Sequence, residues 1–183
     1  MRHLPNIITV LRIASMPFIA WMVLRGEFRS ALAVFAVSAS TDSLDGWLAR
    51  KYGWQSRFGA IADPIADKLF LVFIYLSLGW LGAMPRWLVA VVLGRDVLIL
   101  AFGAVALAFT KVRDFPPTRW GKLSTFFQIL AAGATLTRYA DLLVVPLWPF
   151  FSLTAAWTIG SGFHYLVVAI KRLREEGSGP RQR

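Results

Sequence analysis

Two apolar stretches flank a short polar connection in residues 30–81, which read SALAVFAVSASTDSLDGWLARKYGWQSRFGAIADPIADKLFLVFIYLSLGWL. Each stretch approaches or exceeds the roughly 20 residues that a helix needs to cross hydrocarbon. The connection at residues 50–58 is short, so the two helices are expected to be antiparallel neighbours. Four aspartates lie close to this connection, namely Asp42, Asp45, Asp63 and Asp67. They are expected to converge near one end of the helix pair.

The apolar character continues outward along the whole chain. Apolar residues make up 57% of the 183 residues and charged residues 16%, against roughly 45–50% and about 25% in soluble globular domains. Six apolar stretches predict six transmembrane helices, at residues 7–24, 30–47, 59–81, 87–110, 120–137 and 142–170. Pro146 and Pro149 indicate that the last stretch first runs along the membrane interface. The sequence therefore predicts an all-α integral membrane protein with one domain over residues 1–172 and a flexible basic tail over 173–183.

Positive charge is distributed unevenly between the two sides of this expected bundle. In a soluble protein the net charge of +10 would favour nucleic-acid binding, but here the cations lie mostly between apolar stretches, and no nucleic acid is expected. With six spans both termini share one side, and its cations are Arg2, Arg50, Lys51, Arg57, Lys111, Arg113, Arg119, Lys122, Lys171, Arg172, Arg174, Arg181 and Arg183. The other side has only Arg25, Arg29, Arg86 and Arg138. The positive-inside rule predicts a multi-pass protein of the cell (inner) membrane with both termini cytoplasmic.

The acidic residues in the apolar stretches are functional candidates, because an intramembrane carboxylate costs about 2.5–3.5 kcal/mol. Asp42 and Asp45 are three residues apart and Asp63 and Asp67 four, so each pair shares one helix face. Four converging carboxylates would repel one another and protonate unless a divalent cation neutralised them. Absence of cysteine excludes cysteine-ligated metals, and oxygen ligands favour Mg²⁺ or Mn²⁺, with room for two ions about 4 Å apart. Such ions complete their coordination with substrate phosphates, so a phosphate ester is the expected ligand.

A purely structural interpretation exists for each of these residues. Asp42 or Asp45 could form a salt bridge with Arg50 or Arg57 at the membrane edge. Gly46 and Gly59 could serve only tight helix packing. The combined spacing favours a functional site. Arg50 lies one helical turn beyond Gly46, where its guanidinium group could bind a phosphate.

The spacing of these residues resembles the signature of the CDP-alcohol phosphotransferase family, D-x2-D-G-x2-A-R-x8-G-x3-D-x3-D. The eight fixed positions are all present, as Asp42, Asp45, Gly46, Ala49, Arg50, Gly59, Asp63 and Asp67. The resemblance covers most of the chain, since its length and six-span layout are also similar. It implies transfer of a phosphatidyl or related group from a CDP-linked donor to an acceptor hydroxyl, with release of CMP, at the cytoplasmic side.

The resemblance also implies roles for individual residues. A site for two metal ions would be formed by Asp42, Asp45, Asp63 and Asp67, and Asp67 would act as general base on the acceptor hydroxyl. The CDP donor would be bound by Asn6, Gly46, Ala49, Arg50, Ser56 and Gly59.

Less specific similarities to phosphatidylglycerophosphate synthases and eukaryotic-type cardiolipin synthases indicate the acceptor. They occur at residues 4–12, 63–68, 94–96 and 121–128. They favour transfer from CDP-diacylglycerol to glycerol 3-phosphate, with phosphatidylglycerol as the alternative acceptor. Arg95 and Lys122 are expected to bind the acceptor phosphate, because a cation among apolar residues needs an anion. A buried ion pair with Asp96 is the alternative for Arg95, although adjacent helical residues point in different directions. Lys122 could instead be an interfacial lysine.

Two other classes of membrane protein also have functional aspartates within their helices. Intramembrane prenyltransferases pair aspartate motifs with Mg²⁺ and diphosphates, but they are typically longer and lack the frame of Gly46, Arg50 and Gly59. A divalent-cation carrier would distribute its aspartates across the bilayer, whereas these four gather at one edge. Small residues such as Gly133, Gly160 and Gly162 are expected to serve helix packing or homodimerisation.

Overall fold

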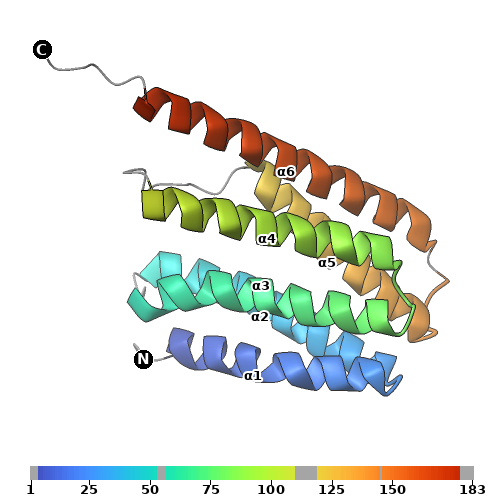
Figure 1. Ribbon diagram of the computed structural model, residues 1–183. Helices are drawn as coiled ribbons and strands as arrows, with labels where there is room; N and C mark the ends of the chain where they lie inside the picture. The colour runs from blue at the N-terminus through green and yellow to red at the C-terminus, as the bar shows by residue number, and fades with distance from the viewer. Residues whose placement is uncertain (1–3, 53–56, 110–118, 145, 178–183) are drawn as a thin grey trace, which may run out of the picture. The chain divides into compact units, whose positions relative to one another are not determined.

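The chain forms six α-helices in the computed structural model, which describes the backbone of residues 4–52, 57–109, 119–144 and 146–177 and the side chains of residues 14–40, 66, 68–102, 120–144, 146–168 and 171. No strand occurs in these parts. In chain order the helices are α1 (Leu4–Leu24), α2 (Phe28–Tyr52), α3 (Arg57–Trp80), α4 (Arg86–Phe109), α5 (Arg119–Tyr139) and α6 (Leu147–Gly177) (Figure 1). The predictions of an all-α fold and of six helices are therefore confirmed.

The bounds of the last helix differ from the prediction. It begins at Leu147 rather than at residue 142, and Pro149 lies in its first turn. Proline is tolerated there because the first N–H groups of a helix have no intrahelical acceptor. The helix then continues to Gly177, so that residues 173–177 of the expected tail are helical, while residues 178–183 lie outside the described chain.

The six helices were expected to span a membrane. Over the described residues, none of them combines the length and the apolar character that such a span requires.

The chain divides into two compact units, and the first comprises residues 1–86 and 129–147. Helix α1 packs against both α2 and α3. Ile19 and Val23 of α1 and Ile74, Tyr75 and Leu78 of α3 are almost completely buried. The part of α5 in this unit meets α2, where a Cβ on Gly133 would lie 3.4 Å from the Phe35 ring. Gly133 thus lies at the contact between these two helices, where a Cβ would be at ordinary van der Waals distance from the ring.

Three turns of the first unit end their helices in the same way. After α1, Gly26 has a φ of 76°, the Gly26 N–H donates to the carbonyl of Val23, and the next N–H donates to that of Met22. Gly82 after α3 and Asp141 after α5 also have positive φ, of 72° and 53°. A residue in the left-handed conformation lets the following N–H groups donate to the last carbonyls of the helix. Glycine adopts this conformation without the cost of a Cβ clash.

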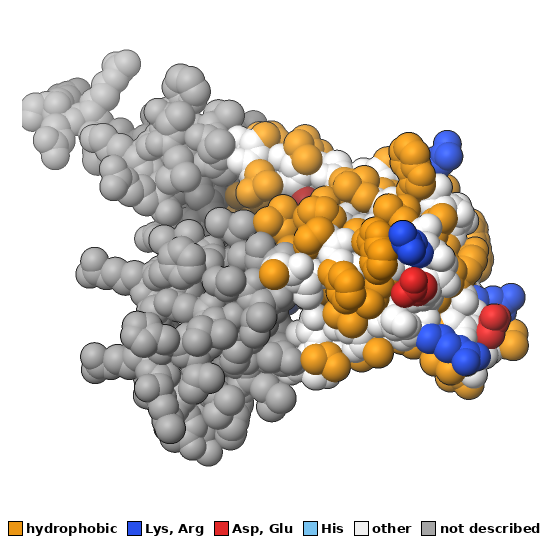
Figure 2. Space-filling view, turned by 90° about the horizontal axis from the view of Figure 1, so that it is seen from below, with side chains coloured by type: hydrophobic (Ala, Val, Ile, Leu, Met, Phe, Trp, Pro, Cys, Tyr) orange, Lys and Arg blue, Asp and Glu red, His pale blue; other side chains and the backbone are white. Residues whose placement is uncertain are grey.

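Apolar side chains extend over the described surface as well as the interior. Figure 2 shows them spread across the coloured part of the face drawn, where only a few Lys, Arg, Asp and Glu side chains lie among them. Among the exposed residues are Trp80, Val144 and Phe163, with 81%, 89% and 69% of their surface accessible. Apolar surface of this extent is typical of a protein that contacts lipid or a partner.

The second unit comprises residues 87–128 and 148–183. Helices α5 and α6 meet through aromatic side chains, because Trp157 lies against both Trp120 and Phe127 at centroid distances of 5.1 and 5.6 Å. Helices α4 and α6 meet at Trp87 and Trp148, whose rings are 6.2 Å apart. Helix α6 therefore contacts both of the other helical segments of this unit.

Candidate functional site

The contact between α2 and α3 sets the register of the acidic positions. Phe35 of α2 and Phe70 of α3 stack with their ring centroids 5.5 Å apart and an interplanar angle of 13°. Asp42 follows Phe35 by seven residues and Asp63 precedes Phe70 by seven, so along antiparallel helices both positions lie at the same level. Seven residues are close to two helical turns, which returns each backbone position to the face that bears the phenylalanine. The helix geometry thus brings Asp42 and Asp63 to the same part of the α2–α3 pair.

The remaining signature residues belong to the same two helices. Asp45, Gly46, Ala49 and Arg50 follow Asp42 within α2. Gly59 and Asp67 lie on either side of Asp63 within α3.

The side chains of the predicted donor and metal residues lie outside the described part of the structure. This holds for Asn6 in α1, for the signature residues in α2 and α3, and for Ser56, whose backbone is also not described. Among the described side chains, no group of three or more His, Asp or Glu residues could hold a metal ion. The assignments of Asp42, Asp45, Asp63 and Asp67 as metal ligands remain predictions.

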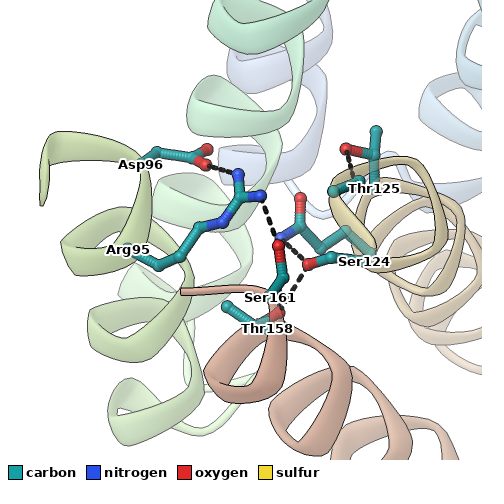
Figure 3. Close-up of polar contacts among 8 residues, drawn as sticks. Arg95, Asp96, Ser124, Thr125, Thr158 and Ser161 are labelled. Carbon is teal, nitrogen blue, oxygen red and sulfur yellow. Dashed lines mark hydrogen bonds and ion pairs between the residues drawn. The ribbon is translucent and has the colours of Figure 1, made fainter. Parts of the chain in front are cut away.

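Arg95 is the one predicted acceptor residue with a well-defined environment in the described chain. Its side chain extends from α4 toward α6 and is only 10% accessible (Figure 3). Nη1 donates to Asp96 Oδ1 at 2.7 Å and Nη2 donates to Ser161 Oγ at 2.7 Å. Nε is buried without a hydrogen-bond partner among the described residues.

The ion pair between Arg95 and Asp96 forms although the two residues are adjacent in α4. The buried ion pair, which the sequence left open as the alternative for Arg95, is thus confirmed, because the long arginine side chain reaches back to the neighbouring carboxylate. Ser161 on α6 holds the other end of the guanidinium group. One carboxylate thus balances the charge of Arg95.

A buried polar cluster links α5 to α6 beside Arg95 (Figure 3). The hydroxyls of Ser124 and Thr158 are 3.1 Å apart, and Gln128 Nε2 donates to both, at 3.3 and 3.4 Å. Thr154 adds a bond from its hydroxyl to the carbonyl of Phe127 at 2.9 Å. These contacts hold the two helices in a fixed register.

The α6 residues of these contacts were not predicted from the sequence. Thr154, Thr158 and Ser161 follow a spacing of four and three residues, which places them on one face of α6 within its mostly apolar part. This periodic polar pattern is the signal that could have identified them. It is visible in the sequence, but their partners in α4 and α5 are not.

Lys122, the second predicted acceptor residue, lies in the first part of α5. It is exposed. It is not among the residues that Arg95 contacts in the described chain. Its assignment to the acceptor phosphate remains a prediction.

Comparison with known proteins places these features in a family. A model of the family described as CDP-alcohol phosphatidyltransferase matches residues 2–168. The cardiolipin synthase (CMP-forming) of Homo sapiens is 30% identical over 88% of this chain and 61% of its own length, so the chain spans about three fifths of that relative. The cardiolipin synthase (CMP-forming) of Streptomyces coelicolor is 32% identical, over 93% of this chain and 83% of its own. A probable phosphatidylglycerophosphate synthase of Mycobacterium tuberculosis is 33% identical, over 92% and 82%.

The matched region contains both halves of the acidic signature as well as Arg95 and the buried cluster between α5 and α6. On this agreement of signature, helical fold and sequence similarity, the chain belongs to the CDP-alcohol phosphatidyltransferase family.

Proposed function

We propose that this protein transfers a phosphatidyl group from CDP-diacylglycerol to a hydroxyl of a glycerol-type acceptor and releases CMP. The observation that carries the proposal is the register of α2 and α3, in which Asp42 and Asp63 occupy the same level of an antiparallel pair. Acids held at one level of two helices suit a diphosphate substrate with its divalent cations. Family membership and the names of the relatives support the same reaction.

The donor set suits a divalent metal site. Four aspartates on two adjoining helices, without a cysteine or histidine in the signature, are the oxygen ligands that Mg²⁺ and Mn²⁺ prefer. The family generally uses a divalent metal. When bound, two such ions would neutralise the diphosphate oxygens and the departing CMP.

The protein's own residues would complete the reaction. Arg50, with Gly46 and Ala49 on the same helix, would bind the cytidine diphosphate part of the donor. Asp67 would accept the proton of the acceptor hydroxyl while the hydroxyl oxygen attacks the phosphatidyl phosphorus. The new bond joins this oxygen to phosphorus, the bond between the phosphatidyl phosphorus and CMP breaks, and CMP leaves with the electron pair.

The proposed site lies at the cytoplasmic edge of a six-span protein of the cell membrane. The family is membrane-bound. Exposed apolar side chains in both units support contact with lipid. The excess of Lys and Arg on one side supports cytoplasmic termini. A homodimer in the bilayer is part of the same proposal.

The acceptor would present a phosphate and a free glycerol hydroxyl. The sequence similarities favour glycerol 3-phosphate, which corresponds to a phosphatidylglycerophosphate synthase. Phosphatidylglycerol, the acceptor of a cardiolipin synthase, has the same recognition groups and gains support from the apolar surroundings of Arg95.

Measurement of CMP release by the purified protein tests the proposal. CDP-diacylglycerol is supplied with Mg²⁺ and with glycerol 3-phosphate, phosphatidylglycerol, inositol phosphate or serine in separate reactions. We expect release with a glycerol-type acceptor only, loss of release with a chelator, and recovery when Mg²⁺ or Mn²⁺ is restored. Release of CMP only with serine or inositol phosphate, or release that persists in the chelator, would contradict the proposal.

A further inference from the structure

An elongated cavity of about 450 Å³ lies between α4 and α6, entirely within the second unit. Its lining extends on α4 from Ala90 to Phe102, about 18 Å along the helix axis, and on α6 from Thr158 to Leu166, about 12 Å. The hydrocarbon core of a bilayer is roughly 30 Å thick, so the chains of one leaflet occupy about 15 Å of it. The cavity is therefore about as long as one acyl chain.

Apolar side chains form most of the cavity wall and also its rim. Leu98 of α4 and Ile159 and Phe163 of α6 line the cavity and are between 59% and 69% accessible. The cavity thus opens onto an exposed apolar surface. Because the family is membrane-bound, we expect hydrocarbon of the bilayer, and not water, to meet this opening.

The polar residues Arg95 and Thr158 of the lining already have partners within the protein. Both Nη atoms of Arg95 are bonded, to Asp96 and to Ser161, and its Nε is buried. Beside Gly162 the arginine presents its aliphatic stem, since Cγ would lie 3.4 Å from a Cβ on this glycine. The hydroxyl of Thr158 belongs to the buried cluster between α5 and α6. The lining therefore favours a hydrocarbon ligand over a charged one.

The missing side chain of Gly94 keeps part of the cavity open. A Cβ on Gly94 would meet no atom within 4 Å, although the residue lies in the interior of α4. Apart from proline, glycine is the least favourable residue at such a position. An unfilled hollow also deprives its walls of dispersion contacts, and a flexible hydrocarbon chain would restore them.

We propose that this cavity binds one acyl chain of a bilayer lipid as a structural ligand, without selection of the head group. The chain lies along Leu98, Ile159 and Phe163 and fills the space beside Gly94. A flexible chain follows the full length of a narrow cavity, whereas the side chains of a second copy of the protein would enter it at separate points. The bound lipid is not a substrate, so the inference does not depend on the donor, the acceptor or the acids of α2 and α3.

The test uses the purified full chain, delipidated in detergent, and two matched variants. Gly94→Leu fills the cavity, and Gly160→Leu adds the same side chain on α6, where a Cβ also meets nothing within 4 Å but which is not part of the lining. Phosphatidylcholine, phosphatidylethanolamine and phosphatidylglycerol with identical chains are added separately, without CDP-diacylglycerol. Native mass spectrometry then gives the number of bound lipids, their Kd and the oligomeric state.

We expect one phosphatidylcholine per chain to be retained, and the other two lipids to bind with a Kd within about twofold of it. Gly94→Leu should raise the Kd about tenfold or more, because the leucine occupies the place of the acyl chain. Gly160→Leu should match the unmodified protein. An equal Kd in both variants, or retention of phosphatidylglycerol alone, would overturn the inference. So would equal lipid binding combined with a change of oligomeric state in Gly94→Leu, since the cavity would then belong to a contact between copies.

A second measurement needs no variant and therefore does not depend on the folding of Gly94→Leu. Phosphatidylcholine with a photoreactive diazirine in one acyl chain is cross-linked to the unmodified protein, and the adducts are located by proteolysis and mass spectrometry. We expect more label at residues 90–102 and 158–166 than at Val37 and Leu76, which are 66% and 51% accessible but do not line the cavity. Equal labelling of all four segments would overturn the inference. Neither measurement involves CMP release, so its failure leaves the proposed function intact.

Discussion

Asp67 is the last acid of the signature and the proposed general base. We expect Asp67→Asn to lower the rate of CMP release by about 10²–10⁴-fold, because the amide cannot accept the hydroxyl proton. Donor binding should largely persist, since three aspartates and Arg50 remain. Turnover and the Kd for the CDP donor are measured together.

Asp141→Asn is the matched control for this variant. Asp141 is exposed in the turn after α5, and asparagine tolerates its positive φ. It should retain full turnover. Substantial activity in Asp67→Asn would remove this residue from the role of base.

Arg95 has a structural partner and a proposed ligand, and a conservative change separates the two roles. Lysine keeps the charge, but its single ammonium nitrogen cannot reproduce the planar fork whose two Nη atoms reach Asp96 and Ser161 separately. We expect Arg95→Lys to raise KM for the acceptor about tenfold while KM for the donor stays unchanged. Arg86→Lys, at the exposed start of α4, is the control. A lower melting temperature with an unchanged acceptor KM would indicate a purely structural ion pair.

At the scale of helices, the register of α2 and α3 is the basis of the proposed metal site. The chain has no cysteine, so a pair of introduced thiols can be cross-linked without background. We expect Asp42→Cys with Asp63→Cys to be joined by a bifunctional reagent that spans about 8–10 Å, the usual distance between packed helices. Cross-linked and free protein are distinguished by mass spectrometry after proteolysis.

Asp42→Cys with Leu76→Cys is the control pair for the register. Leu76 is exposed and lies 13 residues beyond Asp63 in α3, which corresponds to about 20 Å along the helix axis. This pair should remain unlinked. Efficient cross-linking of the control and not of the first pair would disprove the register.

The polar cluster between α5 and α6 is a second contact that joins two helices. Thr158→Val keeps the side-chain shape but removes the hydroxyl that meets Ser124 and Gln128. We expect the free energy of unfolding to fall by about 1–3 kcal/mol, because buried polar groups lose their partner. Ser152→Ala, which removes an exposed hydroxyl bonded within α6, should change it by less than about 0.5 kcal/mol. Equal effects of the two variants, measured by denaturant unfolding in detergent, would refute a stabilising role of the cluster.

For the whole molecule, the charge asymmetry predicts an orientation in the membrane. Single cysteines at Ser178, in the tail, and at Val144, in the turn before α6, should lie on opposite sides. In intact cells a membrane-impermeant thiol reagent is expected to label Val144→Cys but not Ser178→Cys, and both once the membrane is permeabilised. The reverse pattern would show that the positive-inside count assigns the termini to the wrong side.

The amount that could be predicted differs between parts of the molecule. Six helices followed from apolar stretches separated by Gly, Pro and charged residues, because these are local signals. The end of α6 was missed, since the charges of residues 171–176 indicated a tail although Lys, Arg, Leu and Glu are good helix formers. The ion pair of Arg95 with Asp96 was weighed only as an alternative, because side-chain reach and a third residue on α6 decide it.

The sequence by itself determined the family, the helical class and the positions of the acidic signature, because these depend on residue types at fixed spacings within two neighbouring helices. Only the tertiary structure decided which helices face one another, and with them the partners of Arg95 and the hollow between α4 and α6. A cavity arises from what two distant segments leave unfilled, and no local pattern in the chain encodes that space.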